Sequence, residues 1–207
     1  MKLSAVVLFT AAALMNTLSV MSQAKRALII GTKETEETEL IAASDVLRRV
    51  GVEVTIAGLQ DESPIICKEL ASLNVDALFK DVLSDIFDAV ILPGGKEGSQ
   101  YFMNDSRVGE ILRRHEAAGK IIGAICVAPV ALKVHHICPG ASLTSHPFVK
   151  HEFDHSGYTY LDENVVVWKD VLVTSRGPGT AFEWALKLAE LLVGPEKVKE
   201  VRKVMLL

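Results

Sequence analysis

The chain is poor in cysteine and in aromatic residues: it has three Cys among 207 residues, and 6% of its residues are aromatic. Three thiols cannot build the framework of a small disulfide-stabilised protein, and an odd number leaves at least one thiol unpaired within the chain. The formal charge is −4, which argues against nucleic acid as the main partner. Because 49% of the residues are hydrophobic, intrinsic disorder is also excluded.

Long hydrophobic runs are absent except in residues 1–24. There Lys2 precedes the apolar run 3–15, which is too short for a stable membrane span. Ser22-Gln23-Ala24 resembles a signal-peptidase site, whereas the several Arg of a mitochondrial presequence are missing. Met21 is also a candidate second start site. Signal peptide, presequence and bypassed leader therefore all stay open for residues 1–24.

The unpaired thiol bears on location. Free thiols persist most easily in a reducing compartment, so we expect a cytoplasmic protein rather than a secreted one. A mitochondrial or nuclear location is also compatible with the sequence.

Residues 25–207 read as one domain, since neither a linker nor an internal repeat divides them. Short apolar runs alternate with helical patterns, which is typical of a parallel sheet covered by helices on both faces. The sequence thus predicts a three-layer α/β sandwich. We expect strands at 27–30, 52–57, 89–92, 121–125, 158–161, 165–168 and 171–174, and helices at 40–50, 107–118, 127–135 and 181–193.

Three loops that leave predicted strands carry unusual chemistry, and ligands of such sheets bind beyond the carboxyl ends of the strands. The loop 31–39 contains four Glu, the loop 93–98 contains Pro93-Gly94-Gly95, and the loop 123–129 contains Cys126. Cys126 falls between a strand and a helix, which is the arrangement of a nucleophile elbow. A helix N-terminus beginning at Val127 would lower the pKa of this thiol and raise its reactivity.

Other interpretations of the cysteines compete with this one. Most Cys side chains are small buried hydrophobes, and Cys126 has that alternative. Cys67 closes an apolar run and is expected to pack, while nothing around Cys138 suggests activation. We therefore predict that Cys126 is the most acidic of the three thiols.

The Gly94-Gly95 pair offers backbone N–H donors beside Cys126. Its spacing does not match the G-x-G-x-x-G pattern, and no G-K-[ST] follows, so nucleotide binding is disfavoured. An oxyanion site suits these N–H groups better.

A competing motif is HEFDH at residues 151–155, which matches the H-E-x-x-H zinc site of metalloproteases. Asp154 places a charge where such helices are usually apolar, and the available segment between Pro147 and Gly157 is short. We expect a solvated His-rich segment and no bound metal.

The region from about Lys25 to Met205 resembles the ThiJ/PfpI superfamily, and within it the animal branch of parkinsonism-associated deglycases. The motifs that carry the resemblance are KRAL at 25–28, EETE at 36–39, DVLRR at 45–49, VTIAGL at 54–59, ILPGG at 91–95, AIC at 124–126, TSHP at 144–147 and TSRGPGT at 174–180. The resemblance implies a flavodoxin-like, mostly parallel sheet and a homodimer, with the helix at 39–50 in its interface.

The resemblance also implies site residues. Cys126 corresponds to the family's reactive and oxidation-sensing cysteine, and Glu39 to the buried carboxyl that contacts its sulfur. His146 matches a histidine near the cysteine, and Arg49 a basic residue near the pocket. Gly95 and Val127 would provide oxyanion N–H groups. Two departures are Val127, where relatives carry Ala, and Glu69, where relatives carry Arg.

From these residues we expect a protein of oxidative-stress defence that needs no cofactor. Cys126 would act as a redox sensor and as the nucleophile of a glyoxalase or protein deglycase on methylglyoxal-type dicarbonyls or glycated proteins. The alternative is a non-enzymatic, redox-regulated chaperone or interaction protein switched by oxidation of Cys126. A cysteine protease is disfavoured because Val127, rather than a His, follows the nucleophile.

Overall fold

A seven-stranded sheet runs through the centre of the computed structural model, which describes residues 24–207. The strand order is β10-β11-β7-β6-β1-β2-β5, and every neighbouring pair is parallel except β10 with β11. The strands are β1 (Arg26–Gly31), β2 (Glu53–Gly58), β5 (Ala77–Leu78), β6 (Ala89–Leu92), β7 (Ile121–Ile125), β10 (Val165–Trp168) and β11 (Leu172–Ser175). Two short ribbons pair β3 (Ile65–Ile66) with β4 (Ser72–Leu73), and β8 (Ser142–Leu143) with β9 (Thr159–Tyr160).

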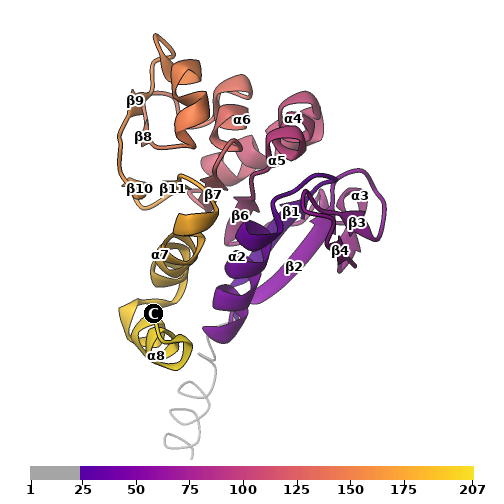
Figure 1. The fold of residues 1–207 in the computed structure, drawn as a ribbon, viewed down its shortest axis with the longest axis vertical. Helices are drawn as coiled ribbons and strands as arrows, with labels where there is room; N and C mark the ends of the chain where they lie inside the picture. Colours follow the sequence, from indigo (N-terminus) through magenta and orange to yellow (C-terminus); the bar gives the residue numbers. More distant parts are fainter. Residues whose placement is uncertain (1–23) are drawn as a thin grey trace, which may run out of the picture.

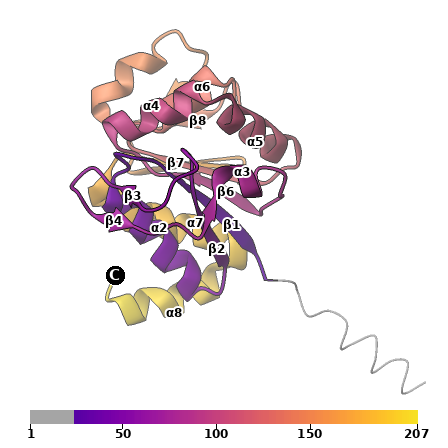
Figure 2. The ribbon, with the colours of Figure 1, turned by 90° about the vertical axis from the view of Figure 1, so that its right-hand side faces the viewer.

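Helices cover both faces of the sheet, as Figures 1 and 2 show. One face carries α2 (Glu37–Arg49), α7 (Ala181–Val193) and α8 (Pro195–Met205), and α2 packs against α7. The other face carries α3 (Phe79–Val82), α4 (Lys96–Asn104), α5 (Ser106–Ala117) and α6 (Pro129–Val134). Two 3₁₀ segments complete the chain, η1 (Pro147–Phe153) and η2 (Pro178–Thr180).

The alternation of side chains along each strand creates two cores. In β1, Ala27 and Ile29 join the core under α2 and α7, whereas Leu28 and Ile30 join the core under α4 and α5. Because both faces are buried, the strand reads as a continuous apolar run rather than as an alternating one. The predicted three-layer α/β sandwich with a mostly parallel sheet is confirmed.

Element boundaries agree with the sequence where the apolar run is sharply bounded, as in β6, β7, β10 and α7. The prediction of a helix from Val127 is wrong, because residues 126–128 form a turn and α6 begins at Pro129. The sequence analysis also missed α4, whose first residues belong to the glycine-rich loop, and α8. The proposed leader lies outside the described residues, apart from Ala24.

The helices of residues 24–207 include no candidate membrane span. None of them combines the length and the apolar character that a transmembrane span requires.

The carboxyl ends of four neighbouring strands meet at one edge of the sheet. β11, β7, β6 and β1 are adjacent and parallel, so the segments that follow Ser175, Ile125, Leu92 and Gly31 lie close together. This edge brings Cys126, Gly95 and the acidic loop before α2 into one region, as expected for ligand sites of open α/β sheets.

Candidate active site

Cys126 occupies a strained turn directly after β7. Its φ is +65°, a left-handed backbone conformation that side-chain-bearing residues rarely adopt. Two backbone hydrogen bonds hold it there: Cys126 N–H donates to Ser175 O at 3.1 Å, and His146 N–H donates to Cys126 O at 2.7 Å. The side chain is 8% exposed. The structure therefore places Cys126 on a sharp elbow, with a small part of the residue open to solvent.

Glu39 lies against this sulfur from the first turn of α2. Its side chain is fully buried, and its Oε2 accepts a hydrogen bond from Gly94 N–H at 2.6 Å. Glu36, the N-cap of α2, accepts from Glu39 N–H at 2.8 Å and fixes the start of the helix. The other carboxyl oxygen, Oε1, is buried and has no hydrogen-bond partner among the described residues. It is thus the carboxyl oxygen left to interact with Cys126.

Both acids have a raised pKa, and in both burial is the main cause. Burial raises the pKa of Glu39 to about 8, against the opposing effect of the Gly94 N–H bond. Burial, and then the Glu39 charge, raise the pKa of the Cys126 thiol to about 12. Two negative charges cannot share this small desolvated volume, so the pair holds at most one charge near neutral pH. Glu39 is consequently protonated in most molecules at pH 7.

The expectation that a helix N-terminus lowers the pKa of Cys126 is wrong. The helix that follows has six residues and begins three positions after the cysteine, so its dipole acts weakly there. Desolvation of the buried Cys126 thiol, which raises its pKa, outweighs this effect of the helix. Burial also raises the pKa of Cys67 to about 11 and of Cys138 to about 12, so Cys126, at about 12, is not the most acidic of the three thiols. All three thiols are free and buried.

Two backbone N–H groups converge on the sulfur. The amides of Gly95 and Val127 both hydrogen-bond to it and thereby oppose the rise in the pKa of the thiol. Gly95 has φ +97°, and a Cβ there would collide with the backbone of Glu34. The sequence-predicted pair of N–H donors is thus assembled around the reactive atom.

Gly94 is a site residue whose role the sequence analysis missed. A Cβ on Gly94 would collide with the Cβ of Cys126 and lie 2.6 Å from Glu39 Oε2. Only glycine lets β6 end so close to both acids while its N–H binds the carboxyl. In the sequence, the Pro93-Gly94-Gly95 run is the signal for this close approach, in addition to indicating a source of N–H donors.

His146 stands at the rim of the site, and its ring is not bonded to the thiol. Its Nδ1 accepts a hydrogen bond from Phe148 N–H at 3.2 Å, where it caps η1. This bond assigns the proton of the neutral ring to Nε2. In this tautomer His146 donates a proton from Nε2 and has no free lone pair, so it is a hydrogen-bond donor rather than a base.

A cavity of about 320 Å³ opens above the sulfur. Gly95, Cys126 and His146 contribute to its lining. Val127, Phe148 and Pro178 form an apolar wall, and Val127 is the bulkier residue noted as a departure from relatives. Glu36, Lys68 and Lys96 supply charges.

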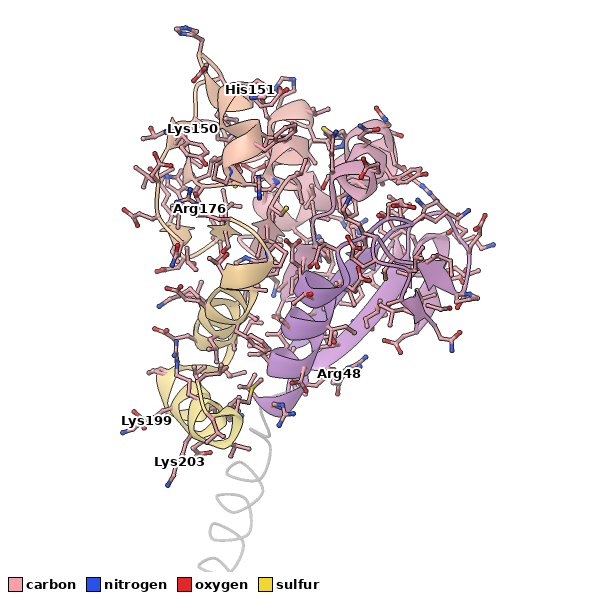
Figure 3. The ribbon with its side chains drawn as sticks, in the orientation of Figure 1. Arg48, Lys150, His151, Arg176, Lys199 and Lys203 are labelled. Carbon is pink, nitrogen blue, oxygen red and sulfur yellow. The ribbon has the colours of Figure 1, made fainter. Side chains whose placement is uncertain are left out.

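Arg49 does not line this cavity, which corrects the expectation of a basic pocket residue at that position. It ends α2, ten residues after Glu39 and therefore about 15 Å farther along the helix. Its guanidinium pairs with Asp45 at 2.9 Å. The adjacent Arg48 can be found at this far end of α2 in Figure 3. The cations beside the cavity are instead Lys68 and Lys96.

The H-E-x-x-H motif does not form a helical metal site. His151 and Glu152 lie in the 3₁₀ segment η1, whereas His155 lies beyond it with φ +54°. Glu152 accepts from Lys133 Nζ at 2.7 Å. Across residues 24–207, no group of three or more His, Cys, Asp or Glu side chains is placed to hold a metal ion.

A doubly covered, mostly parallel sheet with a cysteine elbow at its carboxyl edge defines a class of α/β proteins with a cysteine-centred site. This chain belongs to the DJ-1/PfpI family, whose family model matches residues 25–191. The resemblance drawn from the sequence is confirmed.

Individual relatives are similar over almost the whole chain. Protein dj-1beta of Drosophila melanogaster is 47% identical over 88% of this chain and 97% of the relative. The glutathione-independent glyoxalase DJR-1.2 of Caenorhabditis elegans is 42% identical, and the Parkinson disease protein 7 homolog of Danio rerio 38%, each over 88% of this chain and 97% of the relative. The crystal structure of Drosophila DJ-1beta superposes with a TM-score of 0.87, at 46% identity, over 89% of this chain and 99% of that one.

Proposed function

We propose that this protein is a cofactor-independent, cysteine-dependent glyoxalase or deglycase of oxidative-stress defence, acting on methylglyoxal-type 2-oxoaldehydes. The observation that carries the proposal is the Cys126–Glu39 pair: a strained cysteine, a buried carboxyl that is protonated at neutral pH, and two N–H donors at the floor of a cavity. The similarity to a glyoxalase-named relative supports it.

The reaction starts from the singly charged pair, with the proton on Glu39 and the negative charge on Cys126 Sγ. The first step is addition of this thiolate to the aldehyde carbon. A carbon–sulfur bond forms, and the π electron pair of the carbonyl moves to its oxygen. The N–H groups of Gly95 and Val127 and the Nε2–H of His146 are the donors available to stabilise this negative charge. Glu39 donates its proton to the oxygen and becomes a carboxylate.

Glu39 then acts as the base. It takes the proton from the former aldehyde carbon and returns it to the neighbouring carbonyl carbon, while the hydroxyl proton of the adduct moves to the ketone oxygen. The ketone carbon thereby becomes the alcohol, and the former aldehyde carbon becomes the thioester carbonyl. The product is a thioester of a 2-hydroxy acid, and water cleaves its carbon–sulfur bond to release the acid and the thiol. The aldehyde carbon is oxidised and the ketone carbon reduced, so no external redox partner is needed. A carboxyl with a pKa near 8 suits both proton transfers.

Turnover of methylglyoxal without glutathione tests this proposal. We expect saturable formation of lactate, lost in Cys126→Ala. Cys138→Ala is the matched control, since it removes a buried thiol that does not line the cavity and should retain turnover. If the native protein shows no saturable turnover, the non-enzymatic interaction protein becomes the better account.

The same thiolate supports a role in redox sensing. Peroxide would transfer one oxygen to the sulfur to give a sulfenic acid and hydroxide, and a second peroxide would give a sulfinic acid. The Gly95 and Val127 amides and the Glu39 O–H are donors for the added oxygens. Mass analysis after mild peroxide should show oxygen addition at Cys126 and none at Cys67 or Cys138.

We further propose a homodimer that uses α2. Ile41 on α2 is 43% exposed and Phe182 on the neighbouring α7 is 40% exposed, so two large apolar side chains face solvent on adjacent helices. Sedimentation analysis should give twice the chain mass. Ile41→Lys should shift the equilibrium to monomer, whereas Val204→Lys, at a more exposed apolar position on α8, should leave it unchanged.

A further inference from the structure

A second cavity adjoins the one above Cys126. It has a volume of about 270 Å³, and His146 and Pro178 line both cavities. Arg176, Gly177 and Asn164 contribute to its far side. A Cβ built at Gly177 would lie 3.5 Å from His146 Cδ2, so the loop 176–179 packs directly beside the imidazole. The two cavities therefore lie on either side of His146 and Pro178, and a ligand longer than a three-carbon dicarbonyl could reach from one to the other.

Arg176 is tied closely to the reactive cysteine. It follows Ser175, whose carbonyl oxygen accepts the Cys126 N–H at 3.1 Å. Its own backbone N–H donates to Thr180 Oγ1 at 3.3 Å, which holds the start of the loop. The backbone of Arg176 is thus fixed relative to the sulfur, and Arg176 is a lining residue of the second cavity.

The charge of Arg176 is only loosely compensated. Its nearest carboxylate among the described residues is Asp162, at 3.8 Å, and Asp162 accepts a much shorter bond of 2.6 Å from Lys150. Figure 3 shows Arg176 and Lys150 on the same side of the molecule. Arg176 therefore shares one carboxylate with a closer cation, and its side chain is 28% exposed. A partly desolvated guanidinium is a strong receptor for a carboxylate.

From this geometry we propose that Arg176 is a specificity residue that binds the carboxylate of an extended substrate, in which the reactive carbonyl sits at Cys126. The substrate class is then a 2-oxoaldehyde adduct of an amino acid or short peptide bearing a free carboxylate. A monoanion fits better than a phosphate dianion, because Asp162 stands next to the same cation. The inference rests on the proposed function in taking Cys126 as the reacting thiol.

Affinity alkylation tests Arg176 without requiring turnover. N-iodoacetylglycine and N-iodoacetylglycinamide differ only by carboxylate against amide, and with both the Cys126 sulfur displaces iodide to form a thioether. The quantity measured is the ratio of the two rate constants at Cys126, divided by the same ratio for a small thiol in solution. We expect this normalised ratio to exceed one in the native protein and to fall about fivefold in Arg176→Gln.

Three further variants separate a contact from a structural effect. Arg176→Lys keeps the charge and should restore part of the ratio. Asp162→Asn removes the competing carboxylate and should raise it. Lys203→Gln removes an equal charge on α8, remote from both cavities, and should change nothing (Figure 3). A ratio that is the same in the native protein, Arg176→Gln and Asp162→Asn would overturn the inference.

A turnover measurement separates this inference from the proposed function. The substrates are the hemithioacetals of methylglyoxal with N-acetylcysteine and with N-acetylcysteinamide. Cys126 Sγ bonds to the hemithioacetal carbon, the bond from that carbon to the small thiol breaks, and the small thiolate leaves, which gives the enzyme adduct described above. Faster turnover of the carboxylate form, with a smaller difference in Arg176→Gln, supports both the proposed function and the role of Arg176. Equal turnover of the two forms in native and variant protein leaves the glyoxalase proposal standing and rejects the role of Arg176. Lack of turnover with any carbonyl rejects the proposed function, while the alkylation ratio still decides on the carboxylate site.

Discussion

Glu39 and Cys126 titrate as a pair rather than as two independent residues. The first proton leaves the pair with an apparent pKa near that of Glu39, about 8. The resulting single charge can reside on the carboxylate or, after proton transfer, on the sulfur, where the amides of Gly95 and Val127 stabilise it. The carboxyl thereby provides a route to a thiolate at a pH at which the isolated buried thiol would stay protonated.

This coupling predicts the pH profile of Cys126 alkylation by iodoacetamide. In the native protein we expect an inflection near pH 8. In Glu39→Leu and in Glu39→Gln it should move to higher pH, because the buried thiol must then lose its proton unaided. Glu62→Gln, which removes an exposed carboxylate paired with Lys33, serves as the control. An inflection that moves to lower pH in Glu39→Leu would show that Glu39 acts only by charge repulsion.

Gly94 is the second residue-scale test. Because a Cβ there would collide with Cys126 and press on Glu39, Gly94→Ala should displace the pair and lose the 2.6 Å bond from its N–H to Glu39. We expect Cys126 alkylation and carbonyl turnover to fall at least tenfold, together with a loss of about 1–3 kcal/mol of stability. Gly179→Ala, where the added Cβ would meet nothing within 4 Å, should be close to neutral in stability. The alkylation rate, the turnover rate and the thermal unfolding of the two variants test this prediction.

At the scale of elements, α5 contains a buried histidine that the site does not use. His115 is fully buried, and its Nε2 accepts from Phe87 N–H at 3.0 Å. Its Nδ1–H donates to Ile111 O at 2.7 Å, so both ring nitrogens are satisfied in the neutral state. Burial lowers the pKa of His115, and the nearby Arg114 and Lys120 lower it further.

The direction of the resulting pH effect follows from linkage. The unfolded chain binds a proton at this histidine below about pH 6.5, whereas the folded chain does not until a lower pH. Stability contributed by His115 is therefore complete above that pH and is lost as the pH falls. Chemical denaturation between pH 7 and 5 should show this loss, and His115→Gln should reduce the slope while lowering stability overall. His151→Gln, at an exposed position, should change neither.

At the scale of the whole molecule, burial of Glu39 has a cost that depends on pH. Folding raises the pKa of this carboxyl from 4.5 to about 8. The stability it contributes is complete below pH 4.5 and is lost as the pH rises towards 8, by up to roughly 1.4 kcal/mol for each pH unit in that window. Glu39→Gln should therefore be more stable than the native protein at pH 8 and should flatten this part of the profile. Equal slopes for the two proteins would show that Glu39 is not buried in its acid form.

The same molecule shows what local pattern can predict. The predicted boundaries of strands β6, β7 and β10 and of helix α7 are correct, because each apolar run is bounded on at least one side by a glycine, a proline or a charged residue. The position of Cys126 on an elbow followed from its place directly after a buried strand. Alternation of strands and helices was enough to predict the layered sheet, since such connections pack in only a few ways.

Properties that depend on through-space neighbours could not be read in this way. The pKa of Cys126 is raised by its burial and then by the charge of Glu39, 87 positions earlier in the chain, whereas the local sequence indicates a lowered pKa. Arg49 looked like a pocket residue by likeness, yet it ends a helix that begins at the site and leads away from it. The donor role of His146 depends on a bond to Phe148, and the cavity beside Arg176 exists because β11 adjoins β7. Hydrophobic periodicity and turn-forming residues are local features, so they can be recognised in the sequence. Desolvation, charge coupling and cavity shape arise only when distant segments pack together.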